Sequence, residues 1–171
     1  MSKQKVFCFG FGQVAEFFIN KLIQEKKDFD LSITSRQGTH QIQINNLKVY
    51  SFQFSHEEFD SSIKKQIEEA NYILISIPPI DGRDIVANYL DKNLKNTKNC
   101  KWITYLSATS VYGDHKGEWV NENSITKPTS SNGLSRLAAE NIWRELSIKN
   151  KYPLQIFRLA GIYSNEFNIL R

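Results

Sequence analysis

The chain has 171 residues, of which 40% are hydrophobic and 23% charged, and its net charge at pH 7 is +4. These values are ordinary for a globular protein, and the length favours one domain over residues 1–171 with a core of its own. No apolar run approaches the roughly 18 residues that a membrane span needs, and the first residues lack the pattern of a signal peptide, so we expect no membrane partner.

Short apolar runs alternate with amphipathic runs along the chain. Residues 6–9 predict a first strand, and residues 13–26 a first helix, because Val14, Phe18 and Leu22 recur at helical spacing. The further expected strands cover residues 31–34, 49–52, 72–77, 102–106 and 154–159, and the further expected helices cover residues 84–94 and 135–149.

Two stretches between these elements are less regular. Residues 37–46 contain HQIQI, which alternates like a strand, although a short irregular helix is an open alternative. Ser55 with Glu58 three residues later forms a capping box, which predicts a helix from residue 55 with Phe59 and Ile63 on one face.

The alternation of strands and helices predicts the fold class. Strands that are apolar on both faces indicate a parallel sheet with helices on both sides. We therefore expect an α/β, Rossmann-type doubly wound parallel sheet of three layers, with its six strands in the order 3-2-1-4-5-6.

The segment GFGQVA lies between the first strand and the first helix. Gly10 allows a tight turn, Gly12 lets the backbone approach a pyrophosphate, and Ala15 lets helix and strand pack closely. The N–H groups at the start of a helix favour an anion there. The predicted pyrophosphate contacts are Gly10, Phe11, Gly12, Gln13 and Val14.

The end of the second strand predicts the choice of cofactor. Asp30 precedes that strand, so it lies on the wrong side to bind a ribose 2′-hydroxyl, whereas Ser35 and Arg36 follow the strand. A guanidinium and a hydroxyl suit a 2′-phosphate, which favours NADP over NAD. The alternative is that Arg36 is solvated or stacks on adenine without selecting.

The expected fourth strand ends at ISIPP. In a doubly wound sheet the ligand lies outside the carboxyl ends of the strands, so Ile77 and Pro78 are predicted to line the adenosine or ribose side of the cleft. The alternative is that the two prolines only end the strand.

Taken together, GFGQVA, ISIPP, YLSATSVYGD, SRLAAE and FRLAGIY resemble the extended short-chain dehydrogenase/reductases, the NAD(P)-dependent nucleoside-diphosphate-sugar epimerase/dehydratase group, and its atypical branch most of all. The resemblance covers nearly the whole chain. It implies hydride transfer at the nicotinamide, a cytoplasmic enzyme, a small-molecule substrate such as a nucleotide sugar, and pairing of two copies through the helix at 135–149. Trp143 and Leu146 are candidates for its outward face, although they fit the core equally well, and the helical spacing places Leu137, Ala138, Ile142 and Leu146 inward.

The resemblance also implies where the catalytic groups stand. The family's tyrosine and lysine fall on Asn132 and Arg136, and its serine or threonine falls on Ala108, between Ser107 and Thr109. Asparagine is no base and arginine stays charged, so the usual acid–base set is altered.

Other side chains near these positions are candidates for the missing roles. Thr109 and Tyr112 lie at the expected mouth of the cleft with Asn132 and Arg136, and Ser107 is a candidate cofactor contact. Tyr112 and Lys116 have the Tyr-x-x-x-Lys spacing, but flanking glycines favour a loop there.

The remaining polar patterns predict no further partner. The lysines at 92, 95, 98 and 101 lack interleaved aromatic residues, which favours a solvated face over a nucleic-acid site. Cys8 and Cys100 form neither a CxxC motif nor a cluster, so they indicate two buried reduced thiols and no metal site.

Two functions remain open. One is an oxidoreductase or isomerase with a rebuilt acid–base set, and the other is a non-catalytic NADP(H)-binding redox sensor or partner-binding module. The family's C-terminal substrate lobe is expected to be absent or truncated, because only the 12 residues 160–171 follow the strand at 154–159.

Overall fold

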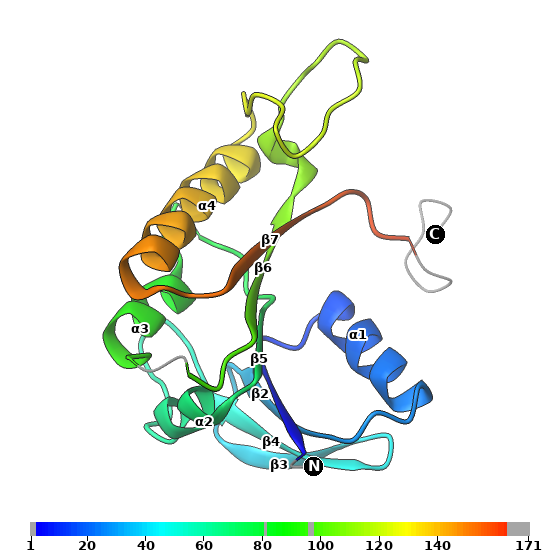
Figure 1. The fold of residues 1–171 in the computed structure, drawn as a ribbon, viewed down its shortest axis with the longest axis vertical. Coiled ribbons are helices and arrows are strands. Elements are labelled where there is room, and N and C mark those ends of the chain that lie inside the picture. Colours follow the sequence, from blue (N-terminus) through cyan, green and yellow to red (C-terminus); the bar gives the residue numbers. More distant parts are fainter. Residues whose placement is uncertain (1–2, 81, 96–97, 164–171) are drawn as a thin grey trace.

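The computed structural model describes residues 3–80, 82–95 and 98–163, and in these ranges it has three layers (Figure 1). Helix α1 lies on one face of the sheet, and α2, α3 and α4 lie on the other. The strands are β1 (Gln4–Phe9), β2 (Phe29–Ser35), β3 (His40–Ile44), β4 (Leu47–Gln53), β5 (Tyr72–Ile75), β6 (Trp102–Ala108) and β7 (Leu154–Leu159). The helices are α1 (Gln13–Gln24), α2 (Ile63–Glu69), α3 (Ile85–Asn93), the 3-10 turn η1 (Thr109–Val111) and α4 (Ser131–Asn150).

The strand order is β3-β4-β2-β1-β5-β6-β7. Six of these strands are parallel and follow the predicted order, which confirms the Rossmann-type fold class. The sheet differs by one further strand, β3, which pairs antiparallel with β4 at the edge. The alternation in HQIQI therefore reports a strand, because Ile42 and Ile44 pack on the core while the polar residues between them face solvent.

The helix predicted from residue 55 is wrong in its start. The Ser55 hydroxyl accepts hydrogen bonds from the backbone N–H groups of Glu57 and Glu58, but these close a local turn, and α2 begins only at Ile63. Phe59 stays 53% exposed instead of packing on the inner face. The capping pattern does not mark a helix start here, because Ser hydroxyls make the same bonds in isolated turns.

Helix α4 begins earlier than predicted, and the expected inward residues Ile142 and Leu146 do pack on the core. Ser130 caps it by accepting a hydrogen bond from the N–H of Gly133 at 3.1 Å. Trp143 is fully buried and Leu146 is 8% exposed, so both belong to the core rather than to an outward face. Trp143 and Leu146 therefore cannot form a contact between two copies of the chain through this helix.

The interior is built as two apolar clusters, one on each side of the sheet. Burial raises the pKa of Cys8 to about 12 and that of the half-buried Cys100 to about 11, so both thiols stay protonated. Among the described helices, none is both long and apolar enough to cross a membrane.

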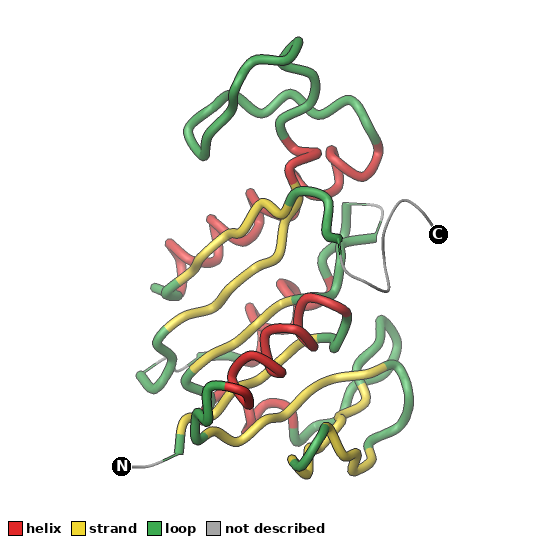
Figure 2. Tube along the Cα trace, turned by 90° about the vertical axis from the view of Figure 1, so that its right-hand side faces the viewer, coloured by secondary structure: helices red, strands yellow, loops and turns green. Residues whose placement is uncertain are grey.

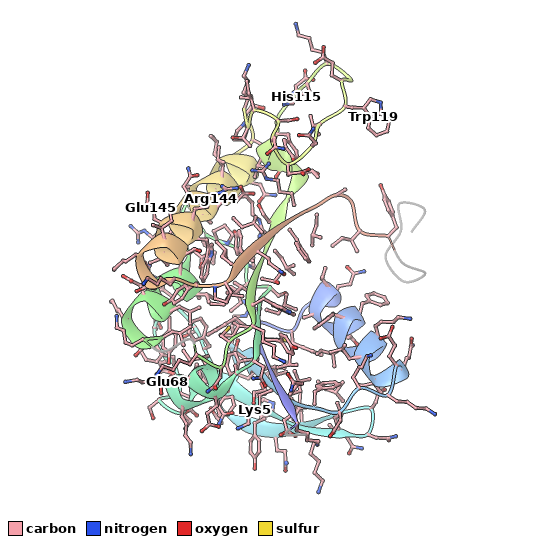
Figure 3. All side chains as sticks on the ribbon, viewed as in Figure 1. Lys5, Glu68, His115, Trp119, Arg144 and Glu145 are labelled. Atoms are coloured by element: carbon pink, nitrogen blue, oxygen red, sulfur yellow. The ribbon has the colours of Figure 1, made fainter. Side chains whose placement is uncertain are left out.

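A long loop connects η1 to α4 and projects beyond the carboxyl end of β6 (Figure 2). Gly113 at its base has φ +74°, and a Cβ there would collide with the carbonyl oxygen of Lys127. Figure 3 shows His115 and the fully exposed Trp119 on this loop. The loop lies on the side of the sheet where β6 and β7 end.

Candidate functional site

A cleft of about 1280 Å³ opens at the carboxyl ends of β1, β2 and β5. This is the edge at which an open parallel sheet binds ligands, next to the point where the strand order reverses. Seven of the predicted cofactor contacts line it together: Gly10, Phe11, Gly12, Ser35, Arg36, Ile77 and Pro78.

The two glycines of the turn differ in why they are glycine. Gly10 has φ +78°, and a Cβ there would come within 2.8 Å of the Ile77 side chain, so the fold itself requires glycine. Gly12 has φ −86°, and a Cβ there would meet only the Ser76 hydroxyl, at an ordinary 3.6 Å. The fold does not need glycine at position 12, which points to the close approach of a ligand.

Gly12 also begins α1. It is the N-cap of the helix and lines the cleft, so the start of α1, where an anion is favoured, lies at the cleft. The turn is held by Thr34, whose hydroxyl accepts a 2.8 Å hydrogen bond from the N–H of Gly10. Thr34 is buried and lines the cleft, and the sequence reasoning missed it because threonine in a strand carries no specific signal.

Ser35 and Arg36, the two predicted phosphate contacts at the end of β2, differ in whether their side chains already bind protein groups. The Ser35 hydroxyl is engaged by protein groups, since it accepts from Ser51 at 3.1 Å and donates to the carbonyl of Gln37 at 3.3 Å. Arg36 is exposed and lines the cleft. Asp30 pairs with Lys3 at 3.1 Å near the start of β2, away from the cleft.

Three further titratable residues line the cleft that no sequence pattern singles out. His40 opens β3, His56 follows β4, and Arg83 follows β5. They lie far apart along the chain, so no sequence pattern groups them. The parallel strand order that brings those loops together was predictable.

The positions aligned with the family's catalytic residues lie elsewhere, around β6, η1 and the start of α4. Ala108 ends β6, Thr109 opens η1, and Asn132 is exposed in the first turn of α4. Arg136 donates from Nη1 to the carbonyl oxygen of Leu106 at 2.7 Å. None of these lines the cleft of the glycine turn, and neither do Gln13, Val14, Ser107 and Tyr112.

Four buried polar side-chain atoms in the described part of the chain have no hydrogen-bond partner. All four lie in this same region: Tyr105 Oη, Ser107 Oγ, Ser110 Oγ and Arg136 Nε. Buried polar groups in proteins normally find a partner, and two such partners are near: Arg136 interacts with the Tyr105 phenol, and Ser107 with Glu140. Burial raises the pKa of Tyr105 to about 12, so this phenol does not replace the family's tyrosine as a base.

A buried ion pair lies beside this cluster. Glu140 is fully buried on α4 and accepts two hydrogen bonds from Arg158 on β7, at 3.0 and 2.8 Å, and one from Arg144 at 3.1 Å. Burial alone would raise the pKa of Glu140, but the hydrogen bonds and the two cations outweigh it and hold the pKa below its usual value. The nearby Ser107 hydroxyl adds to that lowering without making a hydrogen bond of standard geometry.

Arg158 connects this ion pair to Tyr112. The guanidinium carbon lies 4.7 Å from the centroid of the Tyr112 ring, a cation–π contact. Tyr112 is only 7% exposed. Its position is therefore fixed from β7 and α4 together.

A second buried carboxylate, Asp84, joins α3 to α4. Asp84 caps α3 by accepting from the N–H groups of Val86 and Ala87, and its other oxygen accepts from Trp143 Nε1 at 2.8 Å. Its pKa is raised, because burial outweighs these hydrogen bonds and the charge of Arg136. Within the described ranges, no group of three histidine, cysteine or acidic side chains is arranged to hold a metal ion.

Comparison with known proteins identifies relatives by structure. No family model and no curated protein matches the chain. It is similar to a conserved protein of unknown function from Silicibacter pomeroyi, with 29% identity, a TM-score of 0.73, and coverage of 94% of this chain and 54% of that one.

Two epimerases from Bacillus cereus share the same fold. One is a UDP-glucuronic acid 4-epimerase solved in complex with NAD, at 17% identity and a TM-score of 0.74, covering 94% of this chain and 57% of that one. The other is a UDP-N-acetylglucosamine 4-epimerase, at 19% identity and a TM-score of 0.71, covering 99% and 64%. This chain therefore spans between 54% and 64% of the length of these structures. The resemblance to the extended short-chain dehydrogenase/reductases is confirmed at the level of the fold.

Proposed function

We propose that the chain binds a nicotinamide dinucleotide in the cleft at the glycine turn, as part of an enzyme related to the nucleotide-sugar epimerases. Gly12 carries this proposal, because the fold would accept a side chain there and a pyrophosphate would not. The names of the structural relatives support it, since they include NAD complexes and UDP-sugar epimerases.

NADP is the proposed preferred form of the cofactor. Arg36 is exposed at the end of β2 and lines the cleft, where its paired donors suit a phosphate. Ser35 is assigned a supporting role only, because its hydroxyl already bonds to Ser51 and Gln37.

The substrate is proposed to be a nucleotide-sugar-like molecule with a hydroxyl or carbonyl group. It would meet the protein near Thr109, Tyr112, Asn132 and Arg136. The buried Ser110 hydroxyl, which has no hydrogen-bond partner, supports this location. A dimer through α4 stays part of the proposal, with Leu134 (54% exposed) and Ile148 (82% exposed) in place of the buried pair.

A second function is a dinucleotide-binding sensor or partner-binding module without turnover. It is favoured by Arg136, whose guanidinium bonds to the Leu106 carbonyl while an asparagine stands in place of the tyrosine. Addition of candidate carbonyl substrates separates the two functions. Oxidation of NADPH, even if slow, supports the enzyme, and no oxidation supports the module without turnover.

The binding proposal is tested with Gly12→Val. The branched side chain should block the pyrophosphate and lower the affinity for NADPH and NADH at least tenfold, with the fold retained. Isothermal titration of both cofactors measures this, and circular dichroism checks the fold. Ser61→Val is the control, because Ser61 is exposed in the turn before α2 and does not line the cleft. Unchanged affinity in Gly12→Val would place the site elsewhere.

A further inference from the structure

The edge strand β3 leaves one side of its backbone uncovered. It is the last strand of the sheet, next to β4, at the lower end of the molecule in Figure 1. Among the described residues, no backbone–backbone hydrogen bond reaches residues 40–44 from outside the pairing with β4. Proteins commonly protect such an edge with lysine, proline or a bulge, because it is ready to pair with another strand. Residues 40–44 contain no lysine, no carboxylate and no proline, and their register with β4 is unbroken, so this edge is open to pairing.

The ladder between β3 and β4 sets which backbone groups of β3 point outward. Along an antiparallel strand, residues alternate between directing their N–H and C=O groups toward the partner and away from it. At the end of β4, the N–H of Gln53 donates to the Thr39 hydroxyl at 3.0 Å, on the β3 side. The next N–H, of Phe54, donates to the carbonyl of Ser35 at the end of β2. The odd-numbered residues of β4 therefore direct their N–H groups toward β3.

The register carries this alternation over to β3. Val49 of β4 lies opposite Ile42 of β3, so the backbone groups of Ile42 are directed at β4. The residues on either side of it, Gln41 and Gln43, direct their N–H and C=O groups to the open edge. Both glutamines are exposed. The edge thus offers two donors and two acceptors, centred on Ile42.

The segment Gln41-Ile42-Gln43 reads the same in both directions. A second copy can therefore pair with it antiparallel, about a two-fold axis that passes Ile42. The two Ile42 residues would form a non-hydrogen-bonded pair, with about 4.5 Å between their Cα atoms. Gln41 of each copy would lie opposite Gln43 of the other as a hydrogen-bonded pair, which gives about four backbone hydrogen bonds. This register needs outward groups on the two glutamines and not on Ile42, as β3 provides.

The side chains suit the same register. Ile42 and Ile44 are half buried against the apolar cluster beneath α1, so a pair of Ile42 side chains would extend that apolar layer across the axis. Gln41 and Gln43 lie on the other face, where their amides can bond to each other. The nearest lysine on β4, Lys48, lies opposite Gln43 and is separated from the second copy by β3 itself. No like charges would face each other across the axis.

We infer that the chain pairs with a second copy of itself through the β3 edges, antiparallel about a two-fold axis at Ile42, so that one continuous sheet runs through both copies. In this register Ile44 of the second copy lies opposite His40, which lines the cofactor cleft. The turn that follows β3 in one copy therefore borders the cleft of the other. This interface is separate from the pairing proposed for α4, and it does not depend on a bound cofactor.

The first test is sedimentation velocity of the 171-residue chain. The shared strand is short, so the association is weak, and the mass should rise from 19.8 kDa toward twice that value between about 10 µM and about 1 mM. Gln41→Pro removes an outward N–H that β4 does not use, and proline is accepted at a sheet edge, so this variant should associate about tenfold more weakly or less. Gln41→Lys with Gln43→Lys places like charges opposite each other and should have the same effect.

The matched control for the added charge is Ser61→Lys with Thr129→Lys. Both residues are exposed and lie outside β3, so this variant should associate as the parent does.

The second test is specific for the register. Ile42→Cys would place two thiols across the axis, at a separation that a disulfide can span. Mild oxidation with diamide should link this variant into a covalent dimer, whereas Lys48→Cys, on β4, should stay unlinked. Cys8 is buried and Cys100 half-buried, so the parent provides the background for this experiment.

The outcomes separate the possible interfaces. If the parent stays monomeric up to about 1 mM, or if the β3 variants associate as tightly as the parent, the β3 interface is wrong. If Ile148→Lys abolishes the association and the β3 variants do not, the copies pair through α4, and the inference is wrong as well. Circular dichroism checks the fold of each variant, and the lysine pair decides the question if Gln41→Pro does not fold.

Discussion

Thr34 is a single residue on which the geometry of the glycine turn depends. Its buried hydroxyl is the acceptor for the N–H of Gly10, at the point where the backbone leaves β1. Thr34→Val keeps the shape of the side chain and leaves that N–H without a partner, which typically costs about 1–3 kcal/mol when the group is buried. We expect a loss of stability of that order in urea and weaker binding of both cofactors, because the turn would no longer be held.

Thr104→Val is the matched control for Thr34→Val. Thr104 is also a buried threonine in a parallel strand, but its hydroxyl bonds to the Gln155 side chain, away from the cleft. It should lose stability without losing cofactor affinity. Equal loss of affinity in both variants would show that the effect is general and not transmitted through Gly10.

At the scale of elements, α4 and β6 decide whether the chain can perform the family's chemistry. Asn132→Tyr with Arg136→Lys, and then with Ala108→Ser, restores the family's residues on these two elements. A positioned acid–base group contributes about 10²–10⁴-fold, so we expect the parent to show turnover near background and the restored variant to gain reduction of a binding substrate. NADPH oxidation followed at 340 nm measures this gain.

The restoration requires both α4 substitutions. Arg136→Lys alone should give no gain, although it loses the hydrogen bond to Leu106, and it therefore serves as the control. Parent turnover near the ordinary enzyme rate of about 10 s⁻¹ would contradict the altered acid–base set. Tyr112 would then be the next residue to replace.

What the sequence could predict differs between elements for physical reasons. The glycine turn and the parallel strands were predictable, because each depends on residues adjacent in the chain. On α4 the helical spacing indicates Ile142 and Leu146 on the inner face, but it does not reveal the buried Glu140, because a carboxylate is expected on a solvated face. The cleft residues His40, His56 and Arg83 meet only through the sheet order, so single-sequence patterns could not group them.

At the scale of the whole molecule, two buried carboxylates act on stability with opposite signs as the pH changes. The pKa of Glu140 is lowered in the folded chain, so its contribution is fully present above the usual glutamate pKa of about 4.3 and is lost as the pH falls through the lowered pKa. The pKa of Asp84 is raised by burial, so its contribution is fully present below the usual aspartate pKa of about 3.9 and is lost as the pH rises through the raised pKa.

The free energy of unfolding, measured in urea between about pH 3 and about pH 7, should therefore respond differently to the two substitutions. Glu140→Gln should flatten the loss of stability on acidification, because the carboxylate that holds Arg158 and Arg144 no longer titrates. The parent loses stability as Asp84 ionises, and Asp84→Asn removes that loss. The difference in unfolding free energy between Asp84→Asn and the parent should therefore be more favourable to the variant at pH 7 than at pH 3, apart from any constant loss from the altered cap of α3.

Glu140→Gln alone leaves a guanidinium partly buried without its partner, which costs about 3–5 kcal/mol for a buried pair. Glu140→Gln with Arg158→Met removes both charges and keeps the pH slope measurable if the single variant does not fold. An acid limb as steep as the parent's in that double variant would show that Glu140 does not control the acid sensitivity of the fold.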